Sequence, residues 1–249
     1  MVMAQKPTSQ AQPAGAAPQP GPSPSRKPCV FIISAPSGSG KTTLVDRLLK
    51  DLAGLRFSVS YTTRNPRGIE QNGREYYFVS RAEFEAMIAR DDLLEWAEVF
   101  GNYYGTARRF LDEARQHGDD LLLDIDVQGA AKVRRRIPEA VSIFILPPSR
   151  VEMETRLRKR GQDSEEVIAK RLRDARNEIT NVGQYDFVLI NEQLERSAEC
   201  LRAIVLSERN RLSGGSSDSE ALRLQALAAG CRTKTQAERV APILEGFQR

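Results

Sequence analysis

VFIISAPSGSGKT, at positions 30–42, joins a short apolar run to a glycine-rich turn that ends in a Lys-Thr pair. The turn fits the phosphate-loop pattern GxxxxGK followed by Ser or Thr, except that Ala35 replaces the first glycine. Leucines follow at helical spacing, so the segment is predicted to form strand, loop and helix, which is the context that the pattern requires. We therefore expect a phosphate-binding loop here, in preference to a Gly-Ser turn before a surface helix.

The loop has the chemistry of a nucleoside triphosphate site. Glycines let the backbone curl so that successive N–H groups point at phosphate oxygens, and the following helix adds its positive N-terminal end. Lys41 can reach the β- and γ-phosphates, and the Thr42 hydroxyl suits a magnesium ion. The residues predicted to bind ATP in this segment are Gly38, Ser39, Gly40, Lys41, Thr42 and Thr43. ATP with Mg²⁺ is thus the expected donor, but the loop does not identify the acceptor.

Outside the loop, apolar runs alternate with helical patterns long enough for crossovers. The runs are at residues 121–123, 141–146 and 187–190. Such alternation favours an α/β fold, with a parallel sheet of the P-loop NTPase type and helices on both faces.

Two insertions interrupt this pattern. Residues 57–61 and 75–79 are predicted as strands joined through turn residues, which indicates a small, mostly β lobe. Residues 151–179 are rich in Arg and Glu and form two amphipathic patterns broken near Gly161, which indicates a mobile helical lid. After Leu212 the sequence is linker-like, with only a weak helical pattern at residues 222–229.

Composition excludes several classes of protein. No apolar run approaches the about 20 residues of a membrane span, and the overall hydrophobic content is an ordinary 40%. Residues 1–28 hold seven of the thirteen prolines and no apolar centre, which is typical of a disordered segment and not of a secretory signal. We therefore predict a cytoplasmic protein that binds neither a membrane nor a nucleic acid, and leave the oligomeric state open.

Charge and cysteine content agree with this class. The net charge of +4 is assigned mainly to phosphate binding, although the run at residues 134–136 is better explained as a solvated basic face. Cys29, Cys200 and Cys231 are widely spaced and odd in number, so they are predicted to be reduced and structural.

The phosphate loop is one of several motifs that follow one another in unbroken order between residues 28 and 212. The others are SVSYTTRNPR at 58–67, NGREYYF at 72–78, LEWA at 94–97, GNYYGT at 101–106 and LDIDVQG at 123–129. In these motifs the sequence resembles the guanylate kinase family, which also uses alanine at the position of Ala35. The resemblance implies Mg²⁺-dependent phosphoryl transfer from ATP to GMP, giving ADP and GDP.

The resemblance also divides the chain. It implies an N-terminal extension (1–27), a guanylate kinase domain (28–212) and a C-terminal extension of unknown role (213–249). Within the domain the expected parts are the core (28–57, 107–150 and 180–212), the GMP-binding lobe (58–106) and the lid (151–179).

Four residues are candidates for binding the acceptor phosphate. Arg64 and Arg67 lie three apart in a turn-rich segment, where two guanidinium groups could converge on a phosphate, and Tyr76 and Tyr104 offer hydroxyl donors. The resemblance implies that all four bind the GMP phosphate, and that Arg67 also assists transfer. The alternative is that the arginines are solvated and the tyrosines only pack against strands. For either tyrosine considered alone, this alternative is the better explanation.

Three further residues are candidates for recognising the base. Guanine presents two donors, N1–H and the 2-amino group, on one edge, and a carboxylate with two acceptor oxygens matches that edge. By resemblance Glu95 is that carboxylate, and Ser60 and Thr106 are hydroxyls around the base. Thr106 stands where many members have serine, which preserves the hydroxyl.

Asp124 and Asp126 alternate at the end of an apolar run, and such strand ends are where ligands bind in open α/β sheets. We expect Asp126 to contact the acceptor and Asp124 to orient a magnesium-bound water or a phosphate-loop group, although the two roles could be exchanged.

The remaining candidates lie in and after the lid. Arg156, Arg160 and Arg171 resemble the family's lid arginines, which supply positive charge around the transferred group, although nearby glutamates could equally form helix ion pairs with them. Asn191 and Glu192 resemble adenine-side contacts. The residues predicted to act in catalysis are Lys41, Arg67, Arg160 and Arg171, with Arg156, Asn191 and Glu192 binding ATP.

Two rival hypotheses remain. Another small-molecule kinase of this fold would keep the phosphate loop but lose the base-recognising set of Ser60, Glu95 and Thr106. A non-catalytic guanylate-kinase-like interaction module would typically have a damaged phosphate loop, whereas Lys41 and Thr42 are intact here.

Overall fold

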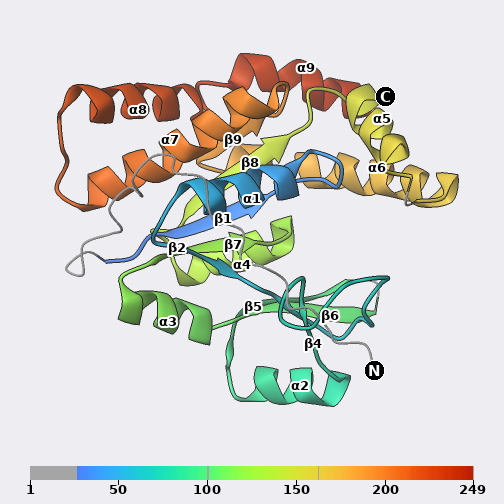
Figure 1. The fold of residues 1–249 in the computed structure, drawn as a ribbon. Helices are drawn as coiled ribbons and strands as arrows, with labels where there is room; N and C mark the ends of the chain where they lie inside the picture. The colour runs from blue at the N-terminus through green and yellow to red at the C-terminus, as the bar shows by residue number, and fades with distance from the viewer. Residues whose placement is uncertain (1–26, 100, 162, 249) are drawn as a thin grey trace, which may run out of the picture.

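The computed structural model describes residues 27–99, 101–161 and 163–248, so the segment expected to be disordered lies outside the described residues, apart from Lys27 and Pro28. At the centre is a five-stranded parallel sheet in the order β2-β7-β1-β8-β9 (Figure 1). Its strands are β1 (Val30–Ser34), β2 (Leu55–Ser58), β7 (Asp120–Asp124), β8 (Val141–Leu146) and β9 (Phe187–Ile190). The predicted parallel sheet is confirmed.

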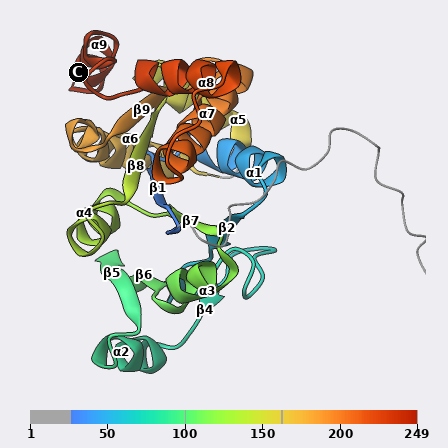
Figure 2. The same ribbon diagram turned by 90° about the vertical axis from the view of Figure 1, so that its left-hand side faces the viewer.

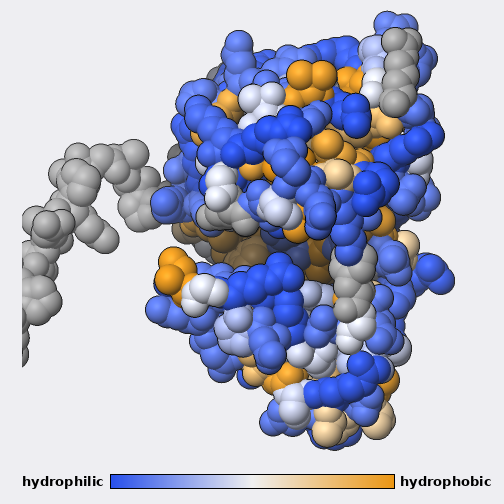
Figure 3. Space-filling view, turned by 90° about the vertical axis from the view of Figure 1, so that its right-hand side faces the viewer, coloured by the Kyte–Doolittle hydropathy of each residue, from blue (hydrophilic) through white to orange (hydrophobic). Residues whose placement is uncertain are grey.

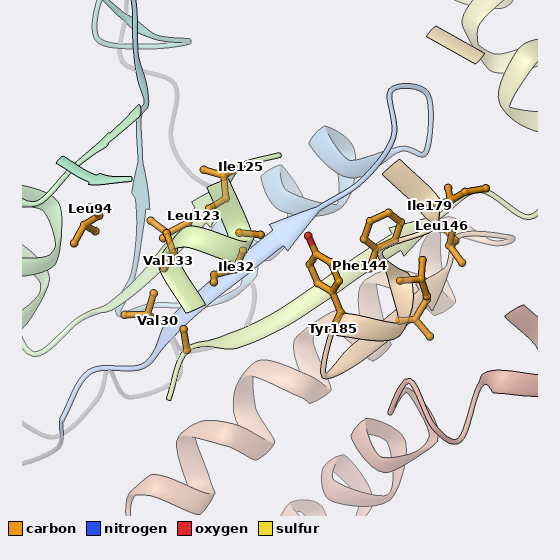
Figure 4. Close-up of a cluster of buried hydrophobic side chains, with 14 of the residues drawn as sticks. Val30, Ile32, Leu94, Leu123, Ile125, Val133, Phe144, Leu146, Ile179 and Tyr185 are labelled. Atoms are coloured by element: carbon orange, nitrogen blue, oxygen red, sulfur yellow. The ribbon is translucent and has the colours of Figure 1, made fainter. Parts of the chain in front are cut away.

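Alternate residues of the strands point to opposite faces of the sheet, and helices cover both faces. Phe31 and Ile33 pack with the first set of helices, α1 (Lys41–Asp51) and α7 (Leu194–Leu212). Val30 and Ile32 pack into the cluster drawn in Figure 4. Helices that contribute to that cluster include α3 (Arg109–His117), α4 (Val127–Arg136), α5 (Arg150–Arg160) and α6 (Glu165–Ile179).

The inserted lobe is a four-stranded sheet in the order β4-β3-β6-β5 with one helix beside it, in the lower part of Figure 1. Its elements are β3 (Tyr61–Thr62), β4 (Tyr77–Phe78), α2 (Arg81–Ala89), β5 (Leu93–Val99) and β6 (Asn102–Ala107). The expected single strand over residues 57–61 is wrong, because β2 ends at Ser58 and Tyr61 already pairs with β6. The chain leaves one sheet for the other in between, so one strand cannot continue through both.

The lid consists of α5 and α6, as predicted, and the break between them falls at Gly161. Gly161 has a φ of 64°, in the left-handed region that a glycine adopts without a steric penalty. Ser149 and Ser164 cap the two helices by accepting hydrogen bonds from backbone N–H groups. A short 3-10 helix, η1 (Val182–Gln184), then leads towards β9.

The C-terminal extension is more structured than its weak pattern suggested. It forms α8 (Ser219–Gly230), which packs on α7, and α9 (Ala237–Gln248), which packs on α5 and α6 (Figure 2). Val240 and Phe247 of α9 are buried in the same cluster as the lid residues. Sequence analysis missed α9, since Pro242 and Gly246 weaken its helical pattern. Within the described part of the chain, no helix has the length and apolar content needed to cross a membrane.

Candidate active site

A cleft of about 670 Å³ lies between the strand ends of the parallel sheet, the lobe and the lid. Figure 3 shows a hollow across the middle of the molecule. It adjoins β1, where the connections run to opposite sides of the sheet, and ligands of open α/β sheets bind at such a point.

Many of the predicted site residues line this cleft. They are Lys41, Thr42, Ser60, Arg67, Tyr76, Glu95, Tyr104, Asp124, Asp126 and Arg171. Other predicted residues are described but lie outside its lining, namely Gly38, Ser39, Gly40, Thr43, Arg64, Thr106, Arg156, Arg160, Asn191 and Glu192.

The phosphate loop is held from behind by the strand end of β9. Asn191 donates a hydrogen bond of 2.7 Å from Nδ2 to the Ser39 carbonyl oxygen. Gly40 has a φ of 89°, and a Cβ atom at this position would overlap Nδ2 of Asn191. The buried Ser39 hydroxyl has no hydrogen-bond partner among the described residues. An unpaired buried donor in a phosphate loop suits a phosphate oxygen.

Lys41 and the two aspartates connect the loop to the sheet. Lys41 begins α1 and forms an ion pair with Asp124 at the end of β7. Asp126 caps α4 by accepting a hydrogen bond of 2.7 Å from the Gly129 N–H. Asp124 is therefore in contact with a phosphate-loop group, and Asp126 is fixed at the start of α4, where it lines the cleft.

The lid arginines differ in their placement. Arg171 donates a hydrogen bond of 2.6 Å to the Ser37 hydroxyl of the phosphate loop and is also paired with Asp163. Arg156 donates to the Asn191 carbonyl oxygen at 3.1 Å. Arg160 is exposed in the last turn of α5 and does not reach the cleft. The structure thus brings two of the three lid arginines to the loop region.

The acceptor-phosphate candidates also differ. Arg64 forms two hydrogen bonds with the Glu70 carboxylate, at 2.9 and 3.0 Å, and these bonds hold the pKa of Glu70 below its usual range. The Arg67 side chain lines the cleft and has no hydrogen-bond or ion-pair partner among the described residues. Tyr76 stacks edge-on against Tyr104, and burial raises the pKa of its hydroxyl, which therefore stays a donor at neutral pH.

Glu95 is the buried carboxylate of the cleft. Its residue is 6% exposed, and its Oε1 accepts a hydrogen bond of 2.8 Å from the Thr106 hydroxyl. Burial raises the pKa of Glu95 to about 7, with a smaller contribution from nearby Asp126. A carboxylate that is desolvated in this way binds a pair of ligand donors strongly, since unmatched burial is costly.

The two residues predicted to lie beside the adenine of ATP, Asn191 and Glu192, have different environments. Asn191 is buried behind the loop, whereas Glu192 is exposed and accepts hydrogen bonds at 3.0 and 3.1 Å from Arg239 of α9. Sequence analysis missed Glu70, Ser37 and Asp163, which hold the predicted arginines. The acid close to Arg64 in the sequence was an available signal for Glu70, and the phosphate-loop motif contains Ser37, but nothing in the local pattern marked Asp163.

The parallel sheet, the phosphate loop and the two insertions around one cleft define a P-loop kinase. Comparison with known proteins specifies the family: the guanylate kinase family model matches residues 26–208. The chain therefore belongs to the guanylate kinase family. Because the match ends at residue 208, α8 and α9 lie beyond the part that the family model matches.

Individual relatives agree with this assignment. The chain is 53% identical to the guanylate kinase of Koribacter versatilis over 222 residues, which cover 88% of this chain and 95% of that protein. It is 48% identical to the guanylate kinase of Escherichia coli K12 over 201 residues, 80% of this chain and 97% of that one. The crystal structure of guanylate kinase from Anaplasma phagocytophilum matches with a TM-score of 0.62 and 36% identity, covering 74% of this chain and 87% of that one.

Proposed function

We propose that this protein transfers the γ-phosphoryl group of ATP to GMP, giving ADP and GDP, and that Mg²⁺ accompanies the ATP. The observation that carries the proposal is the buried Glu95 carboxylate, which lines the same cleft as Lys41 and Thr42 and is held by a hydrogen bond from Thr106 behind it. The carboxylate matches the two donors of guanine, and the loop residues match the phosphates of ATP.

The donor triphosphate would bind along the phosphate loop. The Ser39 hydroxyl, which no described residue pairs with, would bind a phosphate oxygen, and Lys41 would exchange the Asp124 carboxylate for the β- and γ-phosphates. Arg156 and Asn191 both donate hydrogen bonds to the Ser39 carbonyl oxygen of the loop, and they would lie beside the adenine. Glu192 is paired with Arg239, so a direct adenine contact from Glu192 would require that pair to open.

The magnesium site would use the Thr42 hydroxyl, with Asp124 within reach of the same loop. Hydroxyl and carboxylate oxygens are the hard donors that Mg²⁺ prefers, so the residues present fit the ion. When bound, Mg²⁺ neutralises charge on the phosphates. Asp124, released from Lys41, would then orient a water near the ion.

The acceptor phosphate would bind between the lobe arginines and the two tyrosine hydroxyls. Among the described residues nothing forms a hydrogen bond or an ion pair with the Arg67 side chain, so it could turn to the phosphate without breaking one. Arg64 is held by two hydrogen bonds to Glu70, which already orient its guanidinium group. Ser60 and Asp126 would complete the acceptor site around the base and the sugar. The acceptor phosphate is itself an anion at neutral pH, so positioning and positive charge can carry most of the catalysis without a general base.

The lid would supply the remaining positive charge. Arg171 already contacts the phosphate loop through Ser37, and Arg160 would have to move inward to reach the transferred group. Lid movement of this kind also excludes water from the reaction.

An ADP-release assay with ATP and Mg²⁺ tests the proposal when it is run across GMP, AMP, CMP, UMP and ribose bisphosphate. We expect turnover with GMP far above that with every other acceptor. Equal turnover with AMP would contradict the acceptor assignment, and absence of turnover with all five would favour the non-catalytic module.

A further inference from the structure

A second cavity of about 670 Å³ lies between β9, α7 and the two C-terminal helices, away from the active-site cleft. Two thiols line it, Cys200 of α7 and Cys231 at the C-terminal cap of α8. The third cysteine, Cys29, directly precedes β1, and the described residues that line this cavity do not include it. Two of the three cysteines that are widely spaced in the sequence therefore meet at one cavity.

The fold holds this pair in place. The Val188 N–H donates a hydrogen bond of 2.9 Å to the Cys231 carbonyl oxygen, which fixes the turn after α8 against β9. Cys200 lies on α7, and α7 and α8 pack along each other. Both residues are buried, at 9% and 5% exposure, so the cavity is the route by which a small reagent would reach them.

The surroundings favour a thiolate on Cys200. A hydrogen bond between the two thiols lowers the pKa of Cys200 and raises that of Cys231. Arg196 lies one helical turn before Cys200 and stabilises negative charge on it, whereas burial and Glu199 oppose that charge. Arg239 reaches the cavity from α9 and favours negative charge on Cys231. The thiolate is the form of cysteine that attacks disulfides.

We propose that Cys200 and Cys231 form an oxidisable dithiol, which reacts with small-molecule disulfides and closes to an intramolecular disulfide. The Cys200 thiolate attacks one sulfur of the small disulfide, forms a mixed disulfide and releases one thiolate. Cys231 then loses its proton, attacks the Cys200 sulfur and expels the second thiol. Two electrons pass from the protein dithiol to the small disulfide, which is reduced to two thiols.

The consequence is a covalent link between the extension and the parallel-sheet core. The disulfide would close the loop of residues 200–231, which contains α8, and would restrict the unfolded chain. It would also fix the segment that leads into α9. This helix packs against the lid helices, and its Arg239 pairs with Glu192. The redox state of the dithiol would thus change the stability of the extension that supports the lid.

The test uses the full-length protein, reduced and then titrated with oxidised glutathione. We expect mass spectrometry to show loss of two hydrogen atoms and a peptide in which Cys200 and Cys231 are joined, with Cys29 still open to alkylation after unfolding. The melting temperature should rise by about 5 °C or more and return to its starting value after reduction.

Three variants complete the test. Cys29→Ser should keep the disulfide and the melting shift, whereas Cys200→Ser should lose both. Cys231→Ser should trap glutathione on Cys200. Persistence of both free thiols in excess oxidised glutathione, a disulfide that includes Cys29, or an unchanged melting shift in Cys200→Ser would each overturn the proposal.

Discussion

Residue by residue, the most constrained group in the cleft is Glu95, because it is buried and, among the described residues, only Thr106 donates hydrogen bonds to its carboxylate. AMP has no donor at N1 and no 2-amino group, so it would leave this carboxylate desolvated and facing a lone pair. Sites built on such hydrogen bonds reject the wrong ligand by factors on the order of 10⁴.

Replacing Glu95 by Gln should reduce kcat/KM for GMP on the order of 10- to 100-fold, because an amide accepts hydrogen bonds at only one end. The KM for ATP should change little. Glu98→Gln is the matched control, since Glu98 lies on the same strand β5 with its side chain 47% exposed. Steady-state kinetics measure the effect, and GMP kinetics that are equal in the two variants would contradict the role of Glu95.

The raised pKa of Glu95 predicts a pH dependence of GMP binding. Only the ionised carboxylate accepts both guanine donors, so as pH falls through about 7 the KM for GMP should rise by about tenfold per pH unit. A phosphate monoester also titrates, with a pKa of about 6, so Glu95→Gln serves as the reference for that contribution. The difference between the two pH profiles isolates Glu95, and identical profiles would mean that its protonation does not matter.

The raised pKa of Glu95 also affects stability. GMP binding should strengthen as pH rises, whereas the contribution of Glu95 to folding should weaken. The pKa of Glu95 is higher in the folded than in the unfolded protein, so its contribution to folding is present below about 4.5 and is lost as pH rises towards about 7. Glu95→Gln should therefore flatten the pH dependence of the unfolding free energy in this range. Denaturant titrations at several pH values measure it, and an unflattened slope would count against the assignment of the shift to burial.

Lys41→Ala should lower kcat by about 10²-fold or more while the protein stays folded, since the loop amides remain but the charge that bridges the phosphates is lost. Lys50→Ala is the control, because Lys50 is on the last turn of the same helix. Circular dichroism verifies the fold. Near-native turnover of Lys41→Ala would exclude the phosphate-loop assignment.

Among the elements, α9 has the position that the sequence predicted least, because this helix at the C-terminal end of the chain packs against the lid helices α5 and α6. Its apolar side chains pack into the same buried cluster as those of α5 and α6, with Val240 and Phe247 buried and Ile243 and Leu244 partly buried. Arg176 of α6 adds a hydrogen bond of 2.8 Å to Gln248. The lid of this chain is thus supported from outside the part that the family model matches.

Phe247→Ala should lower the free energy of unfolding by about 3–5 kcal/mol, because Phe247 is 2% exposed and its loss leaves a cavity against the lid. Leu222→Ala on α8, where the side chain is exposed, should change it by less than about 0.5 kcal/mol. Denaturant unfolding of both variants provides the comparison. Equal stability of the two would show that α9 does not hold the lid in solution.

For the whole molecule, the positions of the arginines predict closure. Arg160 is exposed outside the cleft, whereas a charge that assists transfer has to reach the phosphates. We expect the lobe and the lid to approach each other when GMP and a non-hydrolysable ATP analogue bind together. Distance labels at Ile69 and Val167, which are exposed on the lobe and the lid, measure this, and an unchanged distance would refute closure.

Local patterns were sufficient for much of the fold. Apolar runs and the glycine-rich turn predicted β1, β7, β8, β9 and the phosphate loop, because a buried parallel strand has to be continuously apolar. The same patterns predicted both lid helices, whose break at Gly161 needs a left-handed backbone. The exchange of sheets between β2 and β3 was missed, since pairing partners are set by distant residues.

The sequence alone was enough to assign the guanylate kinase family and to name the candidate residues, because each motif is contiguous in the chain and can be recognised without its tertiary neighbours. It could not show which partners hold those residues, such as Glu70 on Arg64 or Asp124 on Lys41. Nor could it bring Cys200 to Cys231 or place α9 on the lid. These contacts join segments far apart along the chain, so they exist only once packing of the whole molecule buries their apolar faces together.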